Sequence, residues 1–289
     1  MKTRWVPAIL LTCLLVVGST VHAAAQSSGY EGTGASLKLG LGARAAGMAD
    51  AFVSLADDAT AVYYNPAGLA YLSTSGLVSA YHVQSGVAGY FGIGYAKHNL
   101  GAAILALSSG DIQGTDEFGN PTELFRASEG AILLAGATRF QGLAVGVTLK
   151  QYSQRFADVS GSGLTADVGA LYVGNKVRLA AVGRNLAGGV GYSDGSYDAF
   201  ERSFVIGAST DVLKNFRVAA DYESDGTTRV GTEYVLDNLT FRGGAMFRDG
   251  ETCLTAGLGV RSGAFAFDYA YQTHEVLPDV HRLSLAIRF

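Results

Sequence analysis

The sequence is poor in charge, proline and cysteine. Charged residues make up 16% of the 289 residues and hydrophobic residues 48%, a composition too apolar for an intrinsically disordered chain. There are only 4 prolines beside 39 glycines, and these glycines follow no Gly-X-Y repeat, which excludes collagen and low-complexity linkers. The formal net charge of -4 provides no basic field for a phosphate backbone, so we expect no nucleic-acid partner.

Only two cysteines are present, and the first lies in a predicted signal peptide. Lys2 and Arg4 precede an apolar run, and small residues follow up to Ala25, which is the layout of a secretory signal. We therefore predict a signal peptide over residues 1–25. The alternative is an uncleaved anchor, for which the run is shorter than the roughly 20 residues that a bilayer needs. Export leaves Cys253 alone, which excludes an intrachain disulfide or a cysteine-based zinc site.

No later stretch is long and apolar enough for a membrane helix, and hydrophobicity alternates with a period of two. Bulky residues share one parity in the segments 143–149, 265–271 and 283–289, while small or polar residues occupy the other. A soluble β-sandwich fills its interior with bulky side chains, whereas a membrane barrel points them at lipid. The pattern therefore favours an all-β, transmembrane antiparallel β-barrel.

The alternation predicts about 14 strands over residues 75–289, an even number as bacterial single-chain barrels require. They lie near 75–83, 87–97, 99–109, 128–140, 142–152, 163–173, 176–184, 201–210, 214–222, 229–236, 239–247, 251–261, 263–272 and 280–289. Even-numbered connections are short turns, and the longest odd-numbered ones are 110–127, 153–162, 185–200 and 273–279. The barrel must close, because an unpaired strand edge is too costly in hydrocarbon.

Residues 26–74 break the alternation and form the predicted N-terminal hatch or plug. Apolar and small residues recur at helical spacing over Gly42 to Ala56, which predicts a short amphipathic helix. Arg44, Asp57 and Asp58 are natural partners for charges on the inward parity of the strands. Those predicted lumen charges are Asp167, Arg178, Arg217, Asp221, Asp268, Arg282 and Arg288. The alternative is that they are solvated charges in a wet lumen.

The chain resembles the PorV/PorQ outer-membrane family and, more distantly, the FadL-type transporters of hydrophobic compounds. The resemblance lies in GARAAGMADAFVSLADDATAVYYNPAGLA (Gly42 to Ala70), with support from Ala180 to Gly188 and Phe267 to Phe289. In FadL-like proteins the corresponding N-terminal segment forms a hatch within a fourteen-stranded barrel. The resemblance thus implies a hatch motif formed by Asn65, Pro66, Ala67 and Gly68. Some members of the family belong to a type IX secretion apparatus.

Two functions follow, in the outer membrane of a Gram-negative-type bacterium. The first is a hatch-plugged barrel that passes a hydrophobic or amphipathic small molecule; the alternative is a non-transporting accessory or shuttle component of a type IX-like secretion system. Besides lipid, we expect the barrel-assembly machinery as a partner, and we predict that it reads an insertion signal formed by Leu283, Leu285, Ile287 and Phe289. The four histidines beyond the signal peptide lack metal-binding spacing and no GxSxG motif occurs, so we predict no metal, cofactor or enzymatic activity.

Overall fold

The computed structural model describes residues 34–84, 86, 88–274 and 277–289. The predicted signal peptide lies outside this part of the chain. No helix within the described ranges is long and apolar enough to cross a membrane.

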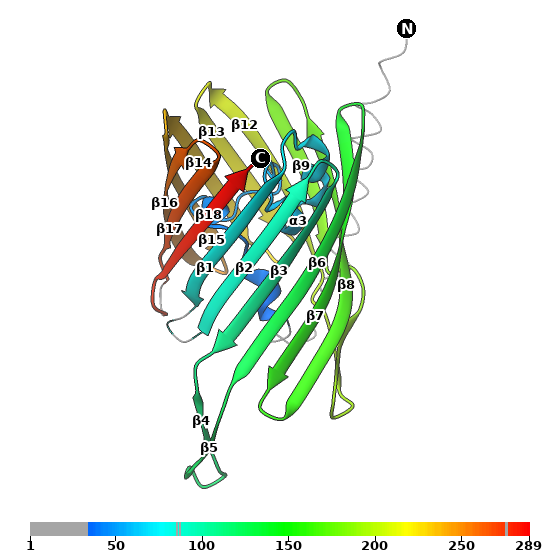
Figure 1. The fold of residues 1–289 in the computed structure, drawn as a ribbon, viewed down its shortest axis with the longest axis vertical. Helices are drawn as coiled ribbons and strands as arrows, with labels where there is room; N and C mark the ends of the chain where they lie inside the picture. The colour runs from blue at the N-terminus through cyan, green and yellow to red at the C-terminus, as the bar shows by residue number, and fades with distance from the viewer. Residues whose placement is uncertain (1–33, 85, 87, 275–276) are drawn as a thin grey trace. The chain divides into compact units, whose positions relative to one another are not determined.

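Among the described residues, fourteen antiparallel strands form a closed barrel, which confirms the predicted fold class (Figure 1). Each strand pairs with the next barrel strand along the chain, and β1 closes the ring by pairing with β18. The barrel strands are β1 (Gly76–Gln84), β2 (Ala88–Lys97), β3 (Leu100–Ser109), β6 (Ala127–Phe140), β7 (Leu143–Phe156), β8 (Val159–Val173), β9 (Val177–Arg184), β12 (Ser203–Leu213), β13 (Phe216–Glu223), β14 (Thr228–Leu236), β15 (Leu239–Arg248), β16 (Glu251–Ser262), β17 (Phe265–Gln272) and β18 (Val280–Arg288).

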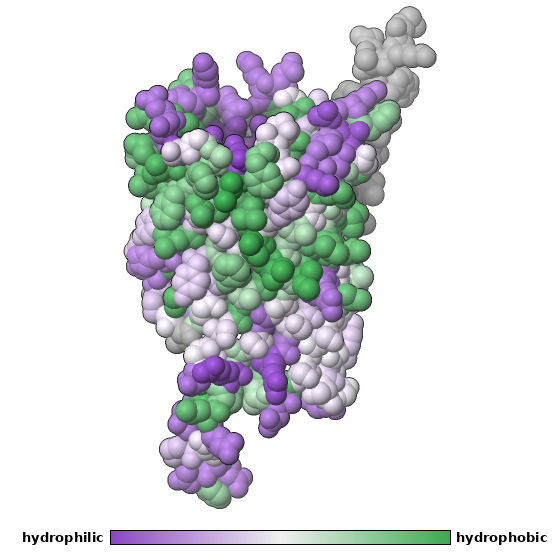
Figure 2. Space-filling model, in the orientation of Figure 1, coloured by the Kyte–Doolittle hydropathy of each residue, from purple (hydrophilic) through white to green (hydrophobic). Residues whose placement is uncertain are grey.

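Bulky side chains point away from the barrel axis. Val145, Phe267 and Leu285 are 47%, 48% and 41% exposed, whereas their opposite-parity neighbours Ala144 and Ser284 are buried. In the face seen in Figure 2, apolar residues cover the middle of the strands and hydrophilic residues gather toward both ends. A surface of this kind suits acyl chains rather than water.

The connections differ in length between the two ends of the barrel. At the turn end, strands are joined by short turns such as those at Asn99 and Gln141, which adopt positive φ values of 67° and 56°. At the loop end lie the longer connections. Two of them contain short strands that the sequence pattern did not predict: β4 (Ile112–Thr115) with β5 (Pro121–Phe125), and β10 (Gly189–Tyr192) with β11 (Tyr197–Ala199).

The prediction of a long connection over residues 153–162 is wrong. β7 continues to Phe156 and β8 begins at Val159, so a tight turn joins the two strands. The serines and glycines of this stretch have extended backbone and pair within the β7–β8 hairpin, and residues Gly161 to Gly163 of β8 also pair with β10.

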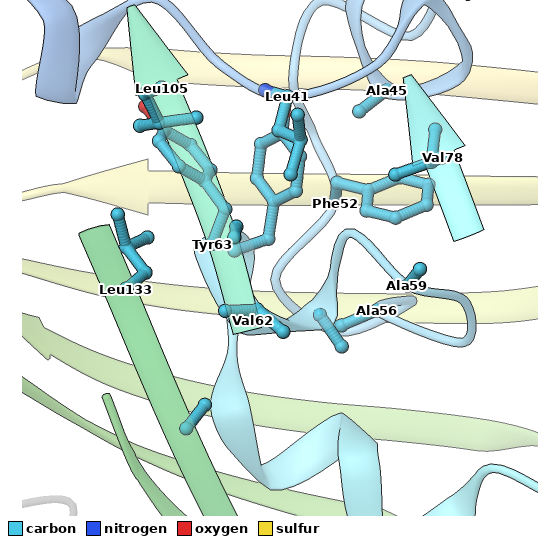
Figure 3. Packing of buried hydrophobic residues seen from close by; sticks show 14 of the residues in the cluster. Leu41, Ala45, Phe52, Ala56, Ala59, Val62, Tyr63, Val78, Leu105 and Leu133 are labelled. Carbon is cyan, nitrogen blue, oxygen red and sulfur yellow. The ribbon is translucent and has the colours of Figure 1, made fainter. Parts of the chain in front are cut away.

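The N-terminal segment, residues 34–75, precedes β1 and lies against the inward face of the strands. It contains η2 (Ala35–Lys38), α2 (Ala43–Ala46), α3 (Ala61–Tyr64) and η3 (Pro66–Tyr71). Its apolar side chains and those of the inner wall form one core, which includes Leu41, Phe52, Leu105 and Leu133 (Figure 3). The barrel interior in this region is therefore a packed core.

The predicted helix over Gly42 to Ala56 is wrong in length, since α2 ends at Ala46. Ala49 and Asp50 adopt left-handed backbone, with φ values of 54° and 58°, which no α-helix contains. A cross-strand glycine pair explains the break. Gly231 of β14 faces Gly244 of β15, and a Cβ at either position would lie within 2.7 Å of an atom of Met48 or Ala49. The backbone thus contacts the wall where a helix would place side chains.

Candidate functional site

The Asn65-Pro66-Ala67 motif lies against a second cross-strand glycine pair. Gly146 of β7 faces Gly169 of β8. A Cβ at Gly146 would lie 2.5 Å from the carbonyl carbon of Pro66, and one at Gly169 would lie 2.1 Å from Oδ1 of Asn65. Only glycine allows this close approach at both positions.

Asn65 connects three parts of the chain through its side chain. Its Oδ1 accepts a hydrogen bond from the Ala67 amide at 3.0 Å, which fixes the start of η3. Its Nδ2 donates to the carbonyl of Val53 at 2.9 Å and to that of Ala170, in β8, at 3.3 Å. Gly68 completes the turn, since a Cβ there would lie 2.0 Å from the carbonyl oxygen of Ala56. The motif thus braces the N-terminal segment against β8.

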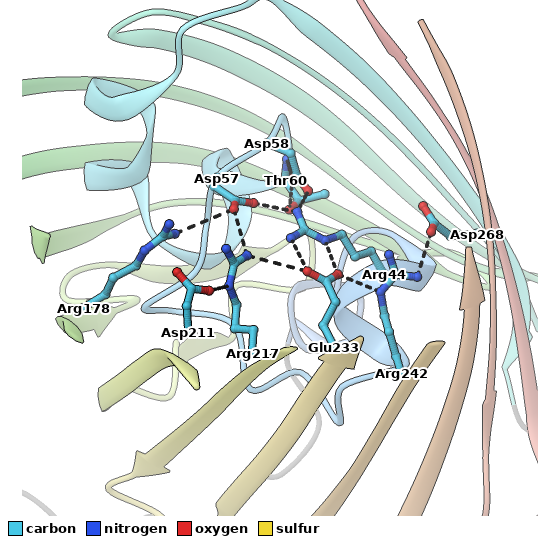
Figure 4. Close-up of polar contacts among 10 residues, drawn as sticks. All are labelled: Arg44, Asp57, Asp58, Thr60, Arg178, Asp211, Arg217, Glu233, Arg242 and Asp268. Carbon is cyan, nitrogen blue, oxygen red and sulfur yellow. Dashed lines mark hydrogen bonds and ion pairs between the residues drawn. The ribbon is translucent and has the colours of Figure 1, made fainter. Parts of the chain in front are cut away.

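A network of charges lies around Arg44, which projects from α2 (Figure 4). Its guanidinium contacts Asp57 at 2.6 Å, Asp58 at 2.7 Å and, across to β14, Glu233 at 2.9 Å. The structure therefore brings together the three residues that were predicted as polar contacts of the hatch. We call these residues, together with their partners on the strands, the Arg44 network.

Strand residues extend the Arg44 network along the inner wall. Two of the predicted lumen charges, Arg217 and Arg178, reach Asp57 at 3.3 and 3.7 Å. A third, Asp268, pairs with Arg242 at 2.8 Å, and Arg242 also contacts Glu233 at 2.9 Å. Continuous opposite-charge contacts therefore connect the N-terminal segment to strands β9, β13, β14, β15 and β17.

The other four predicted lumen charges lie elsewhere on the inner wall. Asp221 accepts hydrogen bonds from the amides of Phe52 and Val53, at 2.8 and 3.1 Å. Three positions remain: Asp167 pairs with Lys150 at 2.7 Å, Arg282 donates to the carbonyl of Leu39, and Arg288 lines a cavity at the turn end.

The sequence analysis did not predict several charged residues of the inner wall, among them Glu233, Arg242 and Lys150, although their parity was readable. Glu233 shares the inward parity of Gly231, opposite the outward Val230 and Tyr234. Arg242 and Lys150 also alternate with bulky outward residues. The sequence pattern does not determine the strand register that places these side chains beside the N-terminal segment.

The network sets the ionisation of its members in the N-terminal segment. Burial alone would raise the pKa of the Asp57 carboxyl, but the Arg44 guanidinium outweighs that effect and holds the pKa below its ordinary value. Burial disfavours the charged form of Arg44 as well, yet Asp57 and Glu233 keep its pKa well above the ordinary value. Both groups are therefore charged at neutral pH, and the contact is a true ion pair.

The N-terminal segment lines two cavities. One, of about 260 Å³, lies at the turn end beside Arg44, Asp57 and Arg288. The other, of about 410 Å³, lies toward the loop end beside Asp50, Tyr64 and Arg282. Within the described ranges, no group of three or more His, Cys, Asp or Glu side chains is arranged to hold a metal ion.

The predicted insertion-signal residues lie on β18 and directly after it. Leu283, Leu285 and Phe289 are 43%, 41% and 67% exposed, and Ile287 is half-buried. The Phe289 ring stacks on Tyr95 of β2 with 6.2 Å between centroids, next to the closing seam of the barrel.

The fold is similar to that of solved barrel proteins. The toluene transporter TbuX of Ralstonia pickettii superposes with a TM-score of 0.63 at 14% identity, over 86% of this chain and 98% of that one. The toluene transporter TodX of P. putida gives 0.58 at 12% identity, over 80% and 94%. A FadL homologue of Pseudomonas aeruginosa gives 0.56 at 11% identity, over 86% and 98%. The chain has the fold of these proteins.

The comparisons by sequence found nothing comparable. No protein-family model matches the chain, and no curated protein matches it. At 11–14% identity the similarity concerns the fold alone. The PorV/PorQ resemblance therefore depends on the motif residues themselves.

Proposed function

We propose that this protein is an outer-membrane barrel of the PorV/PorQ and FadL-like type, which passes small hydrophobic or amphipathic molecules. The N-terminal segment acts as its hatch. The observation that carries the proposal is a packed and ion-paired segment inside a barrel whose outer wall is apolar. Such a segment removes the open aqueous channel of a porin and leaves room only for molecules that move around it.

The same features support a placement in the outer membrane. The exposed apolar side chains of the strands suit a bilayer, and the closed ring leaves no unpaired strand edge in it. The turn end then faces the periplasm and the loop end the exterior, as is usual for barrels with short periplasmic turns. The predicted signal peptide and the predicted insertion signal are consistent with this route.

Two measurements test the proposal. Outer-membrane fractions should contain the protein in a form that migrates differently on a gel before and after boiling. In planar bilayers the purified barrel should conduct small ions poorly, and removing the ion pairs of Arg44 should raise the conductance. A protein that fractionates with soluble periplasmic proteins, or that conducts freely without any substitution, would contradict the proposal.

One feature favours the accessory role in secretion as a second candidate. The β4–β5 hairpin projects beyond the barrel at the loop end, and Phe118 near its tip is 81% exposed (Figure 1). Asp116 orders this tip by accepting hydrogen bonds from the amides of Phe118 and Asn120, at 2.9 and 2.8 Å. A deletion strain separates the two roles: loss of secreted proteins with normal uptake supports the accessory role, and an uptake defect with normal secretion supports passage.

A further inference from the structure

Most of the residues that line the larger cavity are polar or charged. Lys150, Glu223 and Arg229 contribute to its wall, and few of the lining residues are aliphatic. Transfer of a pure hydrocarbon into such a space gains little, because it would separate charged groups from water without replacing their contacts. The composition of the cavity therefore differs from that expected of a site for a molecule such as toluene.

One cation of this cavity, Arg282, forms no ion pair with a carboxylate of the described part of the chain. Many of its neighbours are paired, as in the contact of Arg229 with Glu223 at 2.7 Å. Arg282 of β18 is only 7% exposed, yet its acceptors among the described residues are both neutral, the carbonyl of Leu39 at 2.5 Å and Oε1 of Gln272 at 3.2 Å. Its Nε is buried without a hydrogen-bond acceptor. A buried guanidinium that no described carboxylate contacts directly is costly, and an anionic ligand would relieve that cost.

An unpaired carboxylate lies beside Arg282. Asp50 accepts one hydrogen bond, from the hydroxyl of Tyr64 at 2.6 Å, and forms no ion pair within the described part of the chain. Gly40 marks the place where these groups converge. A Cβ on Gly40 would lie 2.8 Å from the Tyr64 hydroxyl, 3.1 Å from Nη1 of Arg282 and 3.3 Å from Oδ1 of Asp50. All four residues line the cavity.

We propose that this cavity binds a small zwitterion whose ammonium and carboxylate are neighbours, as in an α-amino acid or a short peptide. Arg282 takes the carboxylate and Asp50 takes the ammonium. Leu37 and Leu39 also line the cavity and offer contact for an apolar side chain. The inference rests on the proposed function in one respect: the cavity would be the binding site on the outer side of the route through the barrel.

A matched set of four probes tests the inference on the purified full-length barrel in nanodiscs. L-phenylalanine carries both charges, phenylacetate only the anion, phenethylamine only the cation and toluene neither. Calorimetry gives the affinities of the three soluble probes, and competition against radiolabelled L-phenylalanine gives that of toluene. L-phenylalanine should bind about tenfold tighter than either singly charged probe, because each charge-assisted hydrogen bond adds selectivity of that order.

Two variants should change selectivity in opposite directions. Arg282→Gln should lose about tenfold in affinity for L-phenylalanine and phenylacetate and leave phenethylamine unchanged. Asp50→Asn should lose L-phenylalanine and phenethylamine and leave phenylacetate unchanged. Arg282→Lys, which keeps the charge, should fall between wild type and Arg282→Gln. Lys38→Gln is the matched control, because Lys38 lines the same cavity but pairs with Glu201 at an exposed site.

The results separate the inference from the proposed function. Toluene that competes as well as L-phenylalanine, or folded wild-type barrel that shows no saturable zwitterion binding, would overturn the inference. So would Arg282→Gln and Asp50→Asn barrels that pass the gel-shift test for folding and keep wild-type selectivity. Uptake of L-phenylalanine into proteoliposomes is measured separately. Binding without uptake contradicts the proposed function and leaves the binding site standing.

Discussion

Replacing Arg44 by methionine should loosen the N-terminal segment inside an intact barrel. Arg44 is only 15% exposed and contacts Asp57, Asp58 and Glu233, so its removal leaves three carboxylates close together. Breaking a buried ion pair costs about 3–5 kcal/mol. We take the lower end, about 3 kcal/mol, because Arg217 still reaches Asp57 and Arg242 still reaches Glu233. Local opening should therefore be favoured by a factor of about 100.

Amide hydrogen exchange is the appropriate assay, because it reports local opening separately from global unfolding. Peptides from residues 42–72 should exchange faster in the Arg44→Met barrel, while those of β7 and β8 stay protected. The control is Arg126→Met at the base of the β4–β5 hairpin, whose ion pair with Asp111 is 71% and 50% exposed. That change should cost at most about 0.5 kcal/mol. Equal exchange in wild type and Arg44→Met would refute the view that the network holds the segment.

Three further predictions concern stability, pH and assembly. Gly169→Ala should lower stability by about 1–3 kcal/mol, because the added Cβ would overlap the side chain of Asn65. Gly191→Ala should have little effect, because no atom lies within 4 Å of a Cβ added there. The temperature at which the gel shift occurs measures the stability of both variants. The pKa of the Asp57 carboxyl is lowered in the folded protein, so its contribution to holding the segment is complete above the ordinary pKa of 3.8 and is lost as the pH falls through the lower folded pKa. Amide exchange of residues 42–72 should therefore rise only in acid. Unchanged protection under acid conditions would argue against this. Removal of Phe289 should reduce the amount of folded barrel in outer-membrane fractions, and wild-type amounts would rule out its role as an insertion signal.

The strands could be predicted from sequence because their signal is local. Each outward residue such as Val145 or Leu285 lies on the outer surface of the barrel whatever its strand neighbours are, so parity alone identifies it. The short strands β4, β5, β10 and β11 were missed, because Gly, Ser and Asp are as common in loops as in twisted hairpins.

The interior of the barrel could be predicted only in part, because its contacts depend on register. Gly146 and Gly169 look like ordinary strand glycines until pairing places them opposite each other and against Pro66. The helical spacing over Gly42 to Ala56 was misleading for the same reason. The spacing describes the segment alone, whereas the wall at Gly231 and Gly244 requires backbone contact after Met48.

The seam of the barrel lies between β1 and β18, the first and last strands of the chain. These two strands cannot pair until β18 has been synthesised, and such distant pairing is the slowest to form. The N-terminal segment leads directly into β1, and its backbone closely approaches strand glycines on two sides of the ring. Because the glycine contacts of this segment lie on β7, β8, β14 and β15, the segment can dock on the inner wall before β1 and β18 close the ring.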